Sequence, residues 1–228
     1  MFDIPMELKS LEESIVAYEQ EPIIKGKIMF YGHSLFTRWG SGKWAERVRP
    51  MTQDICMKDG SLAVVNHGFG TSTTEERLYY YDRMVRPWEP RALVLATMGN
   101  DVGFGYSARD VMEIEARIIQ WAQADFPGIP IYCFSRTPRP SWKRESATNR
   151  AKRLRLEHNA FLEDFCARTE NCHYVAQQNM PMFFENPEDV GDYNKVRDDI
   201  FAEDGVHLNP KGYGLFMDAM RELLSDLL

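Results

Sequence analysis

The sequence predicts an α/β fold in which one parallel sheet is covered by helices on both faces. Five short apolar runs stand along the chain, and each is mostly continuous rather than alternating, as strands covered on both faces are. Stretches with the three- and four-residue spacing of amphipathic helices lie between these runs. Alternation of strands and helices is typical of a parallel sheet with helices on both sides.

The five expected strands are the apolar runs at residues 27–31, 62–65, 92–97, 130–134 and 173–176. Five strands of this kind predict a three-layer α/β/α sandwich with a five-stranded parallel sheet, a flavodoxin-like domain. A chain of 228 residues can bury one core well and is rather short for two. We therefore expect residues 1–228 to form a single domain.

The expected helices span residues 7–19, 107–126, 145–168 and 210–227. In the first helix, Leu11, Ile15 and Tyr18 share one stripe. In the third, His158 falls on the apolar stripe, which predicts a core or boundary position. Pro210 suits the first turn of the last helix.

Residues 177–205 differ from the rest of the chain. They are polar, rich in Pro and Asp, and show no periodicity. A loop of this length in a compact domain is usually functional or mobile.

Composition excludes some classes of function. The net charge of −7 and the pI near 5.3 argue against a nucleic-acid-binding protein, which is usually basic. No run approaches the roughly eighteen apolar residues of a membrane span. The first twenty residues carry acidic side chains where a secretory signal needs apolar ones. These observations favour a cytoplasmic protein without a membrane span.

The four cysteines, Cys56, Cys133, Cys166 and Cys172, form no CxxC pair, so reduced thiols are expected. Cys133 lies in an apolar run and is expected in the core. Cys172 beside His173 is a weak metal signal without a second ligand pair. We expect no metal and no cofactor.

Ligands bind to such sheets at the carboxyl ends of the strands, so the segments after each strand are where a site is expected. Four segments there carry polar groups: Gly32-His33-Ser34, Asn66-His67-Gly68-Phe69-Gly70, Met98-Gly99-Asn100-Asp101 and Asp204-Gly205-Val206-His207. All four would meet at one edge of the sheet.

Together these groups suit acyl transfer. The Ser34 hydroxyl is a poor nucleophile until a base takes its proton, and a histidine such as His207 suits that task. A tight turn can place Asp204 on the other ring nitrogen of His207. The oxyanion that forms needs donors, each worth about 3–4 kcal/mol of barrier. The candidate donors are the Ser34 and Gly68 backbone N–H groups and the Asn100 amide.

This arrangement resembles the GDSL or SGNH hydrolases, a family of serine esterases and lipases. The resemblance extends from Lys27 to about Leu215, and the closing DGVHLNPKGY at residues 204–213 is especially similar. It implies the three-layer fold predicted above. It also implies that Ser34 is the nucleophile, that Asp204 and His207 complete a catalytic triad, and that Gly68 and Asn100 complete the oxyanion hole.

The chain departs from the family pattern at two positions. His33 stands before the serine, where the family usually has Asp. Met98 stands where the third block usually has Gly. Neither residue is a triad member, so we expect effects on the rate or the pocket shape. His33 could add a local positive charge when protonated.

Each motif alone also has a simpler interpretation. Ser34 could cap a helix, Asn100-Asp101 could form a turn, and His207 could lie on the surface. Only their joint occurrence is specific. His33, His67 and Phe69 are candidate substrate-binding residues because of their place in the loops.

Residues 136–155 carry eight basic residues and one acid. A solvated helix face is the favoured interpretation, and capture of an anionic substrate or partner is the alternative.

The sequence thus predicts a serine esterase that acts on a small-molecule ester through an acyl-enzyme. Acetyl groups on sugars are the preferred substrate class, with lysophospholipids or thioesters second. Two alternatives remain open: an acyltransferase with the same triad, and a non-catalytic module that binds a carbohydrate or a protein.

Overall fold

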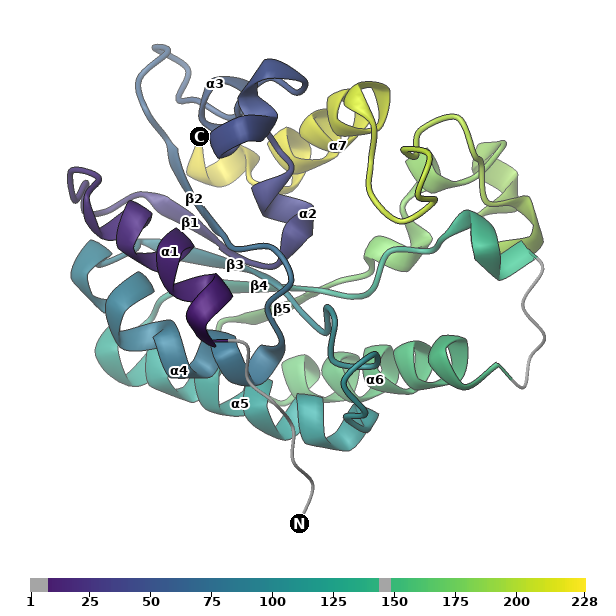
Figure 1. Ribbon diagram of the computed structural model, residues 1–228, viewed down its shortest axis with the longest axis horizontal. Helices are drawn as coiled ribbons and strands as arrows, with labels where there is room; N and C mark the ends of the chain where they lie inside the picture. Colours follow the sequence, from purple (N-terminus) through teal and green to yellow (C-terminus); the bar gives the residue numbers. More distant parts are fainter. Residues whose placement is uncertain (1–7, 144–148) are drawn as a thin grey trace.

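The computed structural model describes residues 8–143 and 149–228, and its centre is a parallel sheet (Figure 1). The strands are β1 (Ile28–Gly32), β2 (Val64–Gly68), β3 (Ala92–Ala96), β4 (Ile131–Phe134) and β5 (Cys172–Val175). They form one five-stranded sheet in the order β2-β1-β3-β4-β5, with every neighbouring pair parallel. This is the flavodoxin-like strand order, so the predicted fold is confirmed.

Helices cover both faces of the sheet, as Figure 1 shows. One face carries α1 (Leu8–Glu19), α4 (Thr74–Met84), α5 (Ala108–Asp125) and α6 (Arg150–Ala167). The other face carries α2 (Ser34–Thr37), α3 (Met51–Asp54) and α7 (Pro210–Leu223). Strand β1 shows how the two layers arise, because its side chains alternate between the faces. Met29 and Tyr31 pack in one hydrophobic cluster, and Ile28 and Phe30 pack in the other.

Most element bounds agree with the prediction to within two residues. The expected last helix is an exception, because α7 ends at Leu223 and residues 225–227 form a separate 3-10 turn. β2 also differs. The expected strand ended at residue 65, whereas β2 continues through Asn66 and His67 to Gly68. The sequence did not predict this extension, because Asn66 and His67 are polar. His67 is only 1% exposed, and its Nδ1 lies 2.7 Å from the carbonyl oxygen of Met84. A buried polar group with a hydrogen-bond partner is compatible with a central sheet.

Helix α4 was not among the expected helices. Its start carries a capping box, in which the Thr73 and Glu76 side chains each accept a bond from the other's backbone N–H. Tyr80, Tyr81 and Met84 lie on its buried face.

Residue 7 of the expected first helix and residues 145–148 of the expected third helix lie outside the described residues. The stripe position predicted for His158 is confirmed, since its side chain is fully buried.

The long polar segment is packed rather than loose. Residues 177–205 contain no α-helix or strand, but they form four short 3-10 turns. Several apolar residues of this segment are buried in the core on the α7 face: Phe183, Phe184, Val196, Ile200 and Phe201. The 3-10 turns of the described chain are Gly42–Glu46, Arg86–Trp88, Pro140–Lys143, Gln177–Asn179, Pro181–Phe183, Pro187–Asp189, Tyr193–Lys195 and Ser225–Leu227.

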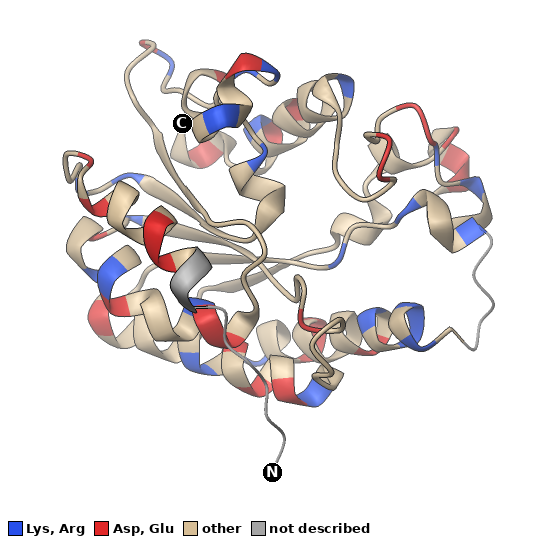
Figure 2. Cartoon of the chain, viewed as in Figure 1, with Lys and Arg blue, Asp and Glu red and all other residues tan. Residues whose placement is uncertain are grey.

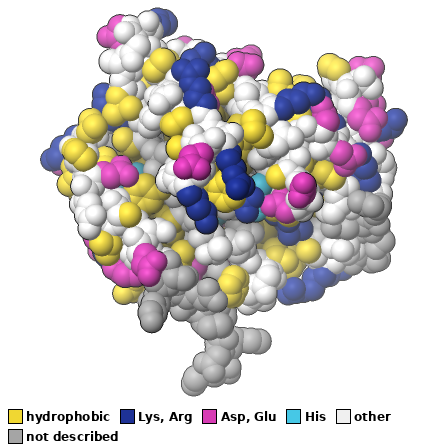
Figure 3. Space-filling model, turned by 45° about the horizontal axis from the view of Figure 1, so that its top comes forward, with side chains coloured by type: hydrophobic (Ala, Val, Ile, Leu, Met, Phe, Trp, Pro, Cys, Tyr) yellow, Lys and Arg dark blue, Asp and Glu magenta, His cyan; other side chains and the backbone are white. Residues whose placement is uncertain are grey.

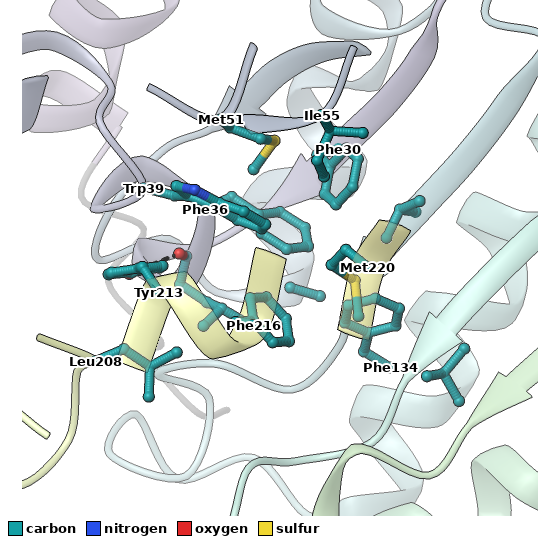
Figure 4. Close-up of a cluster of buried hydrophobic side chains, with 14 of the residues drawn as sticks. Phe30, Phe36, Trp39, Met51, Ile55, Phe134, Leu208, Tyr213, Phe216 and Met220 are labelled. Atoms are coloured by element: carbon teal, nitrogen blue, oxygen red, sulfur yellow. Dashed lines mark hydrogen bonds between the residues drawn. The ribbon is translucent and has the colours of Figure 1, made fainter. Parts of the chain in front are cut away.

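Aromatic packing joins α7 to the segment that carries α2 (Figure 4). The Trp39 ring lies 5.3 Å from the Phe216 ring and 5.7 Å from the Tyr213 ring. The Tyr213 hydroxyl donates a hydrogen bond to the Leu35 carbonyl oxygen at 2.9 Å. Because α7 begins at Pro210, this contact holds the loop just before α7 beside the start of α2.

Three cysteines meet in the core on the α6 face. Sγ of Cys172 lies 3.2 Å from Sγ of Cys166 and 3.7 Å from Sγ of Cys133. The buried position predicted for Cys133 is confirmed, and the described cysteines are free thiols, as expected. His173 does not join this cluster, because its exposed ring stacks on Tyr132 instead.

Within residues 8–143 and 149–228, no helix is long and apolar enough to cross a bilayer.

Candidate active site

Ser34 stands where β1 passes into α2. Strand β1 ends at Gly32, and the His33 ring caps the helix, with its Nδ1 3.2 Å from the Leu35 backbone nitrogen. A side chain at position 32 would meet Ala96 Cβ at 2.5 Å, so only glycine fits there. Ser34 is half-buried, and its Oγ donates to His207 Nε2 at 2.8 Å.

The turn before α7 holds the partners of Ser34. His207 Nδ1 donates to Asp204 Oδ2 at 2.8 Å. Asp204 Oδ1 accepts from the backbone N–H groups of Val206 and His207, each at 2.9 Å. Gly205 has φ of +61°, a conformation that favours glycine. The structure thus brings Ser34, His207 and Asp204 into one hydrogen-bonded chain.

Within this hydrogen-bonded triad, the local charges favour a neutral His207 beside an ionised Asp204. Partial burial raises the pKa of Asp204, but hydrogen bonds from the His207 backbone and ring outweigh it and hold the pKa well below its usual range. Burial lowers the pKa of His207, and the Asp204 hydrogen bond opposes that shift. The cation of Arg38, with Nη1 3.0 Å from Asp204 Oδ2, lowers the pKa of His207 further.

As the pH is lowered, the Arg38→Gln variant should begin to lose activity at a higher pH than the wild type does. General-base catalysis needs the neutral ring, so kcat/KM falls as the pH drops through the pKa of His207. Removing the nearby cation raises that pKa and also frees Asp204 to stabilise the protonated ring. The acid limb of the kcat/KM–pH profile should therefore move upward. Arg168→Gln is the control, because Arg168 follows α6 near the opposite edge of the sheet. An unchanged limb in Arg38→Gln would contradict the assignment of His207 as the base.

Asn100 reaches the same pocket from the loop after β3. The buried Asp101 anchors this loop, because its carboxylate accepts from the backbone N–H groups of Thr74 and Gly99, each at 2.7 Å. Asn100 Nδ2 donates to the Ser72 carbonyl oxygen at 3.0 Å. An amide nitrogen carries two hydrogens, so the second remains for a ligand.

Asn100→Ala should lower kcat about 10²- to 10³-fold, the loss typical of removing one oxyanion donor. KM should change much less, because the donor acts on charge that develops during the reaction. Steady-state kinetics on a 4-nitrophenyl ester measures both quantities. Asn194→Ala, at an exposed 3-10 turn, is the matched control. A fall in kcat of less than about threefold would rule out Asn100 as an oxyanion donor.

The structure corrects the expectation for Gly68. Its backbone N–H donates to Asn66 Oδ1 at 3.1 Å, and its carbonyl oxygen accepts from the Tyr18 hydroxyl at 2.6 Å. Glycine is needed at 68 because α2 packs against it: a Cβ there would lie 2.5 Å from the Thr37 backbone nitrogen. Helix packing, and not the approach of a substrate, explains this glycine.

The turn at Gly70 and Thr71 lies closer to Ser34. A Cβ built on Gly70 would lie 3.9 Å from Ser34 Cβ. Within the described residues, the N–H groups of Gly70 and Thr71 have no hydrogen-bond partner. Thr71 has φ of +68°, which is strained for a β-branched residue. The sequence did not predict this turn as part of the site, although Gly70 lies in the polar segment Asn66–Gly70 that follows the second expected strand.

The other expected contacts are also corrected. His67 and Phe69 cannot touch a substrate, because both are buried on the α1 and α4 face; Phe69 is 0% exposed and packs on Tyr31 and Tyr80. His67 packs on Tyr18 instead.

The two departures from the family pattern have different consequences. Met98 is fully buried with its side chain in a small core cluster, away from the pocket. The His33 ring does line the pocket, but it carries no positive charge: burial and the neighbouring Arg136 hold its pKa well below the ordinary value. A Cβ at Gly99 would come within 2.8 Å of this ring, which explains that glycine.

A pocket of about 60 Å³ surrounds the Ser34 hydroxyl. Its lining residues are His33, Ser34, Leu35, Gly99, Asn100, Arg136, Thr137, Arg139, Val206 and His207. Figure 3 shows histidine surface beside Lys and Arg side chains on this side of the molecule. A larger hollow of about 460 Å³, lined by Tyr18 and Trp88 among others, contains none of the triad candidates. The sequence interpretation named neither Arg136 nor Arg139 as a site residue, and gave capture of an anionic substrate by residues 136–155 only as an alternative.

Comparison with known proteins identifies the family. The sequence pattern of the GDSL-like lipase/acylhydrolase family matches residues 30–215. The chain belongs to this family. It is accordingly a hydrolase of ester bonds. No curated protein is matched by its sequence.

Solved structures share the fold of this GDSL-like hydrolase. A GDSL-like lipase from Bacteroides thetaiotaomicron has a TM-score of 0.67 at 18% identity, with 97% of this chain and 98% of the other covered. Esterase EstA from a Pseudoalteromonas species has a TM-score of 0.62 at 17% identity, with 89% and 98% covered. A mutant of a Geobacillus acetyl-xylooligosaccharide esterase has a TM-score of 0.61 at 15% identity, with 89% and 95% covered.

Proposed function

We propose that this GDSL-like hydrolase is a serine esterase with Ser34 as the nucleophile. One observation carries the proposal: Ser34 Oγ and Asp204 Oδ2 lie on opposite ring nitrogens of His207, each at 2.8 Å. In this geometry His207 Nε2 takes the proton as Ser34 attacks the ester carbonyl carbon. Asp204 orients the ring and stabilises its charged form.

The reaction proceeds through two acyl transfers. His207 returns the proton to the departing alcohol oxygen, which leaves the acyl group on Ser34. Water then attacks the acyl-enzyme while His207 takes its proton, and the acid is released with Ser34 restored.

Three donors support the developing oxyanion in this proposal. The Ser34 N–H is a first-turn helix donor of the kind that lacks an intrahelical partner. Asn100 contributes its second amide hydrogen, and the Gly70 N–H replaces the Gly68 donor that the sequence suggested.

The size of the pocket favours a small acyl group. Its volume of about 60 Å³ is far below the several hundred Å³ typical of sites for drug-sized ligands. We therefore propose acetyl esters, including those on carbohydrates, as the substrates. One neighbour in fold is an acetyl-xylooligosaccharide esterase, which agrees with this class. A non-catalytic binding module is disfavoured, because such a module has no need of a hydrogen bond between Ser34 and His207.

A chain-length series of 4-nitrophenyl esters, from acetyl to octanoyl, tests the proposal together with acetylated xylo-oligosaccharides. We expect kcat/KM to be highest for acetyl and butyryl esters and to fall with longer chains. Product analysis with and without a sugar acceptor separates hydrolysis from transfer. A maximum at octanoyl, or acyl-sugar as the main product, would contradict the proposed substrate class or reaction.

A further inference from the structure

A buried arginine lies in the pocket beside Ser34. Arg136 follows β4 at the carboxyl edge of the sheet and is 6% exposed. It lines the same pocket as Ser34 and His207. Its backbone N–H donates to Asn159 Oδ1 at 2.9 Å, which fixes the chain there. The proposed triad assigns Arg136 no role.

The Arg136 guanidinium is only partly satisfied. Nη1 lies 2.9 Å from His33 Nε2, whereas Nε is buried without a hydrogen-bond partner in the described part of the chain. A guanidinium has five N–H donors, so one contact with an imidazole nitrogen leaves most of its capacity unused. Positioning His33 alone does not require an arginine.

No carboxylate neutralises this cation directly. Within residues 8–143 and 149–228, Arg136 makes no ion pair within 4.0 Å. The charge of Asp101 raises the pKa of Arg136, but the Asp101 oxygens accept from the backbone N–H groups of Thr74 and Gly99. Burial, together with the cations of Arg139 and Arg155, lowers the pKa of Arg136. A buried cation without a paired anion is unfavourable, and a bound anion would offset that penalty.

Arg139 adds a second cation to the same pocket. It is half-buried and lines the pocket with Arg136. Pro138 and Pro140 flank it and restrict the backbone on both sides. Figure 2 shows Lys and Arg on the chain that leaves β4 and again in the first turns of α6. The solvated face predicted for this segment is only partly confirmed, because Arg150 and Arg153 of α6 are exposed whereas Lys152 and Arg155 are half-buried. The first residues of the segment, Arg136 and Arg139, line the catalytic pocket.

We propose that the esters hydrolysed here carry an anionic oxygen group, such as a carboxylate or phosphate, that binds Arg136 and Arg139 beside the reacting carbonyl. This inference rests on the proposed esterase function and narrows its substrate class. Arginine binds both carboxylate and phosphate through parallel N–H···O bonds, so the two share one chemistry.

Matched ester pairs test the inference. On the alcohol side, 4-acetoxybenzoate is compared with 4-acetoxybenzamide, and 4-acetoxyphenyl phosphate provides the phosphate arm. On the acyl side, phenyl hydrogen glutarate is compared with phenyl methyl glutarate, after subtraction of uncatalysed hydrolysis. The readout is the ratio of kcat/KM for the anionic and neutral member. We expect a ratio of at least about ten in one arm, because a charged hydrogen bond contributes about 1.5–3 kcal/mol.

Variants identify the groups responsible. Arg139→Gln should lower the ratio about tenfold, and Arg136→Gln by at least as much if it folds. Arg136→Lys should retain part of the preference, because it keeps the charge. Arg168→Gln removes the same charge near the opposite edge of the sheet and should leave the ratio unchanged. Ratios near one in every arm, or an unchanged ratio in Arg139→Gln, would overturn the inference.

A binding measurement separates this inference from the proposed function. The Ser34→Ala variant is titrated with 4-acetamidobenzoate and 4-acetamidobenzamide, which resist hydrolysis. Tighter binding of the anion that is lost in the Ser34→Ala/Arg139→Gln double variant supports the anion site even if no ester is turned over. Equal affinities would overturn the anion site, while hydrolysis of neutral acetates would leave the esterase proposal standing.

Discussion

The Ser34→Ala variant should lose about 10⁴- to 10⁶-fold in kcat toward 4-nitrophenyl acetate, the range seen when a serine nucleophile is removed. Without the hydroxyl, His207 has no proton to remove and no acyl-enzyme forms. The change deletes one oxygen from a half-buried side chain, so the melting temperature should change little. Residual activity would come from oxyanion stabilisation and binding alone.

The comparison needs a matched control. Ser61→Ala makes the same change in an exposed turn before β2 and should keep wild-type kcat. A Ser34→Ala variant that retains more than about a tenth of wild-type kcat would rule out Ser34 as the nucleophile, since such a loss is only about 1.4 kcal/mol.

His207→Gln should lose about as much activity as Ser34→Ala, because serine and histidine act as one unit. The glutamine can fill part of the space but cannot accept and return a proton near neutral pH. The double variant Ser34→Ala/His207→Gln should be no slower than either single variant. Circular dichroism checks that α7, which follows the histidine loop, remains folded.

The double variant gives the decisive comparison. Two modest single losses that multiply in the double variant would mean that Ser34 and His207 act independently. The 2.8 Å contact between them would then be a structural hydrogen bond only.

The sequence predicted the fold and the Ser34–His207–Asp204 chain well because each depends on a strong local signal. Continuous apolar runs mark the buried strands, and the DGVH turn of residues 204–207 is short enough to fix Asp204 against His207. The parallel sheet brings the ends of its strands to one edge, but the position of that turn beside Ser34 depends on the packing of α7, where the Tyr213 hydroxyl donates to the Leu35 carbonyl oxygen.

The remaining site residues could not be ranked from the sequence alone. Gly68 and Gly70 are two residues apart, and only packing shows that α2 covers the first while the second lies near Ser34. His67 resembled a loop residue because a polar side chain seemed to end β2, yet it lies in the strand and is buried. Arg136 was one of many basic residues until the fold placed it beside His33.

Packing also gives the long segment before Asp204 its structure. Residues 177–205 show no period that a sequence can reveal, but their scattered aromatic residues fill the core beneath α7. An antiparallel bridge between Phe201 and Leu208 closes the turn that holds Asp204 and His207. Such contacts between distant residues leave no local signal.

The most direct test of the account is covalent labelling with a fluorophosphonate probe, followed by peptide mass spectrometry. The account predicts one modified residue, Ser34, with labelling abolished in Ser34→Ala and strongly slowed in His207→Gln, whose base is missing. Labelling of a different serine in the folded wild type, or labelling that continues undiminished in Ser34→Ala, would contradict it.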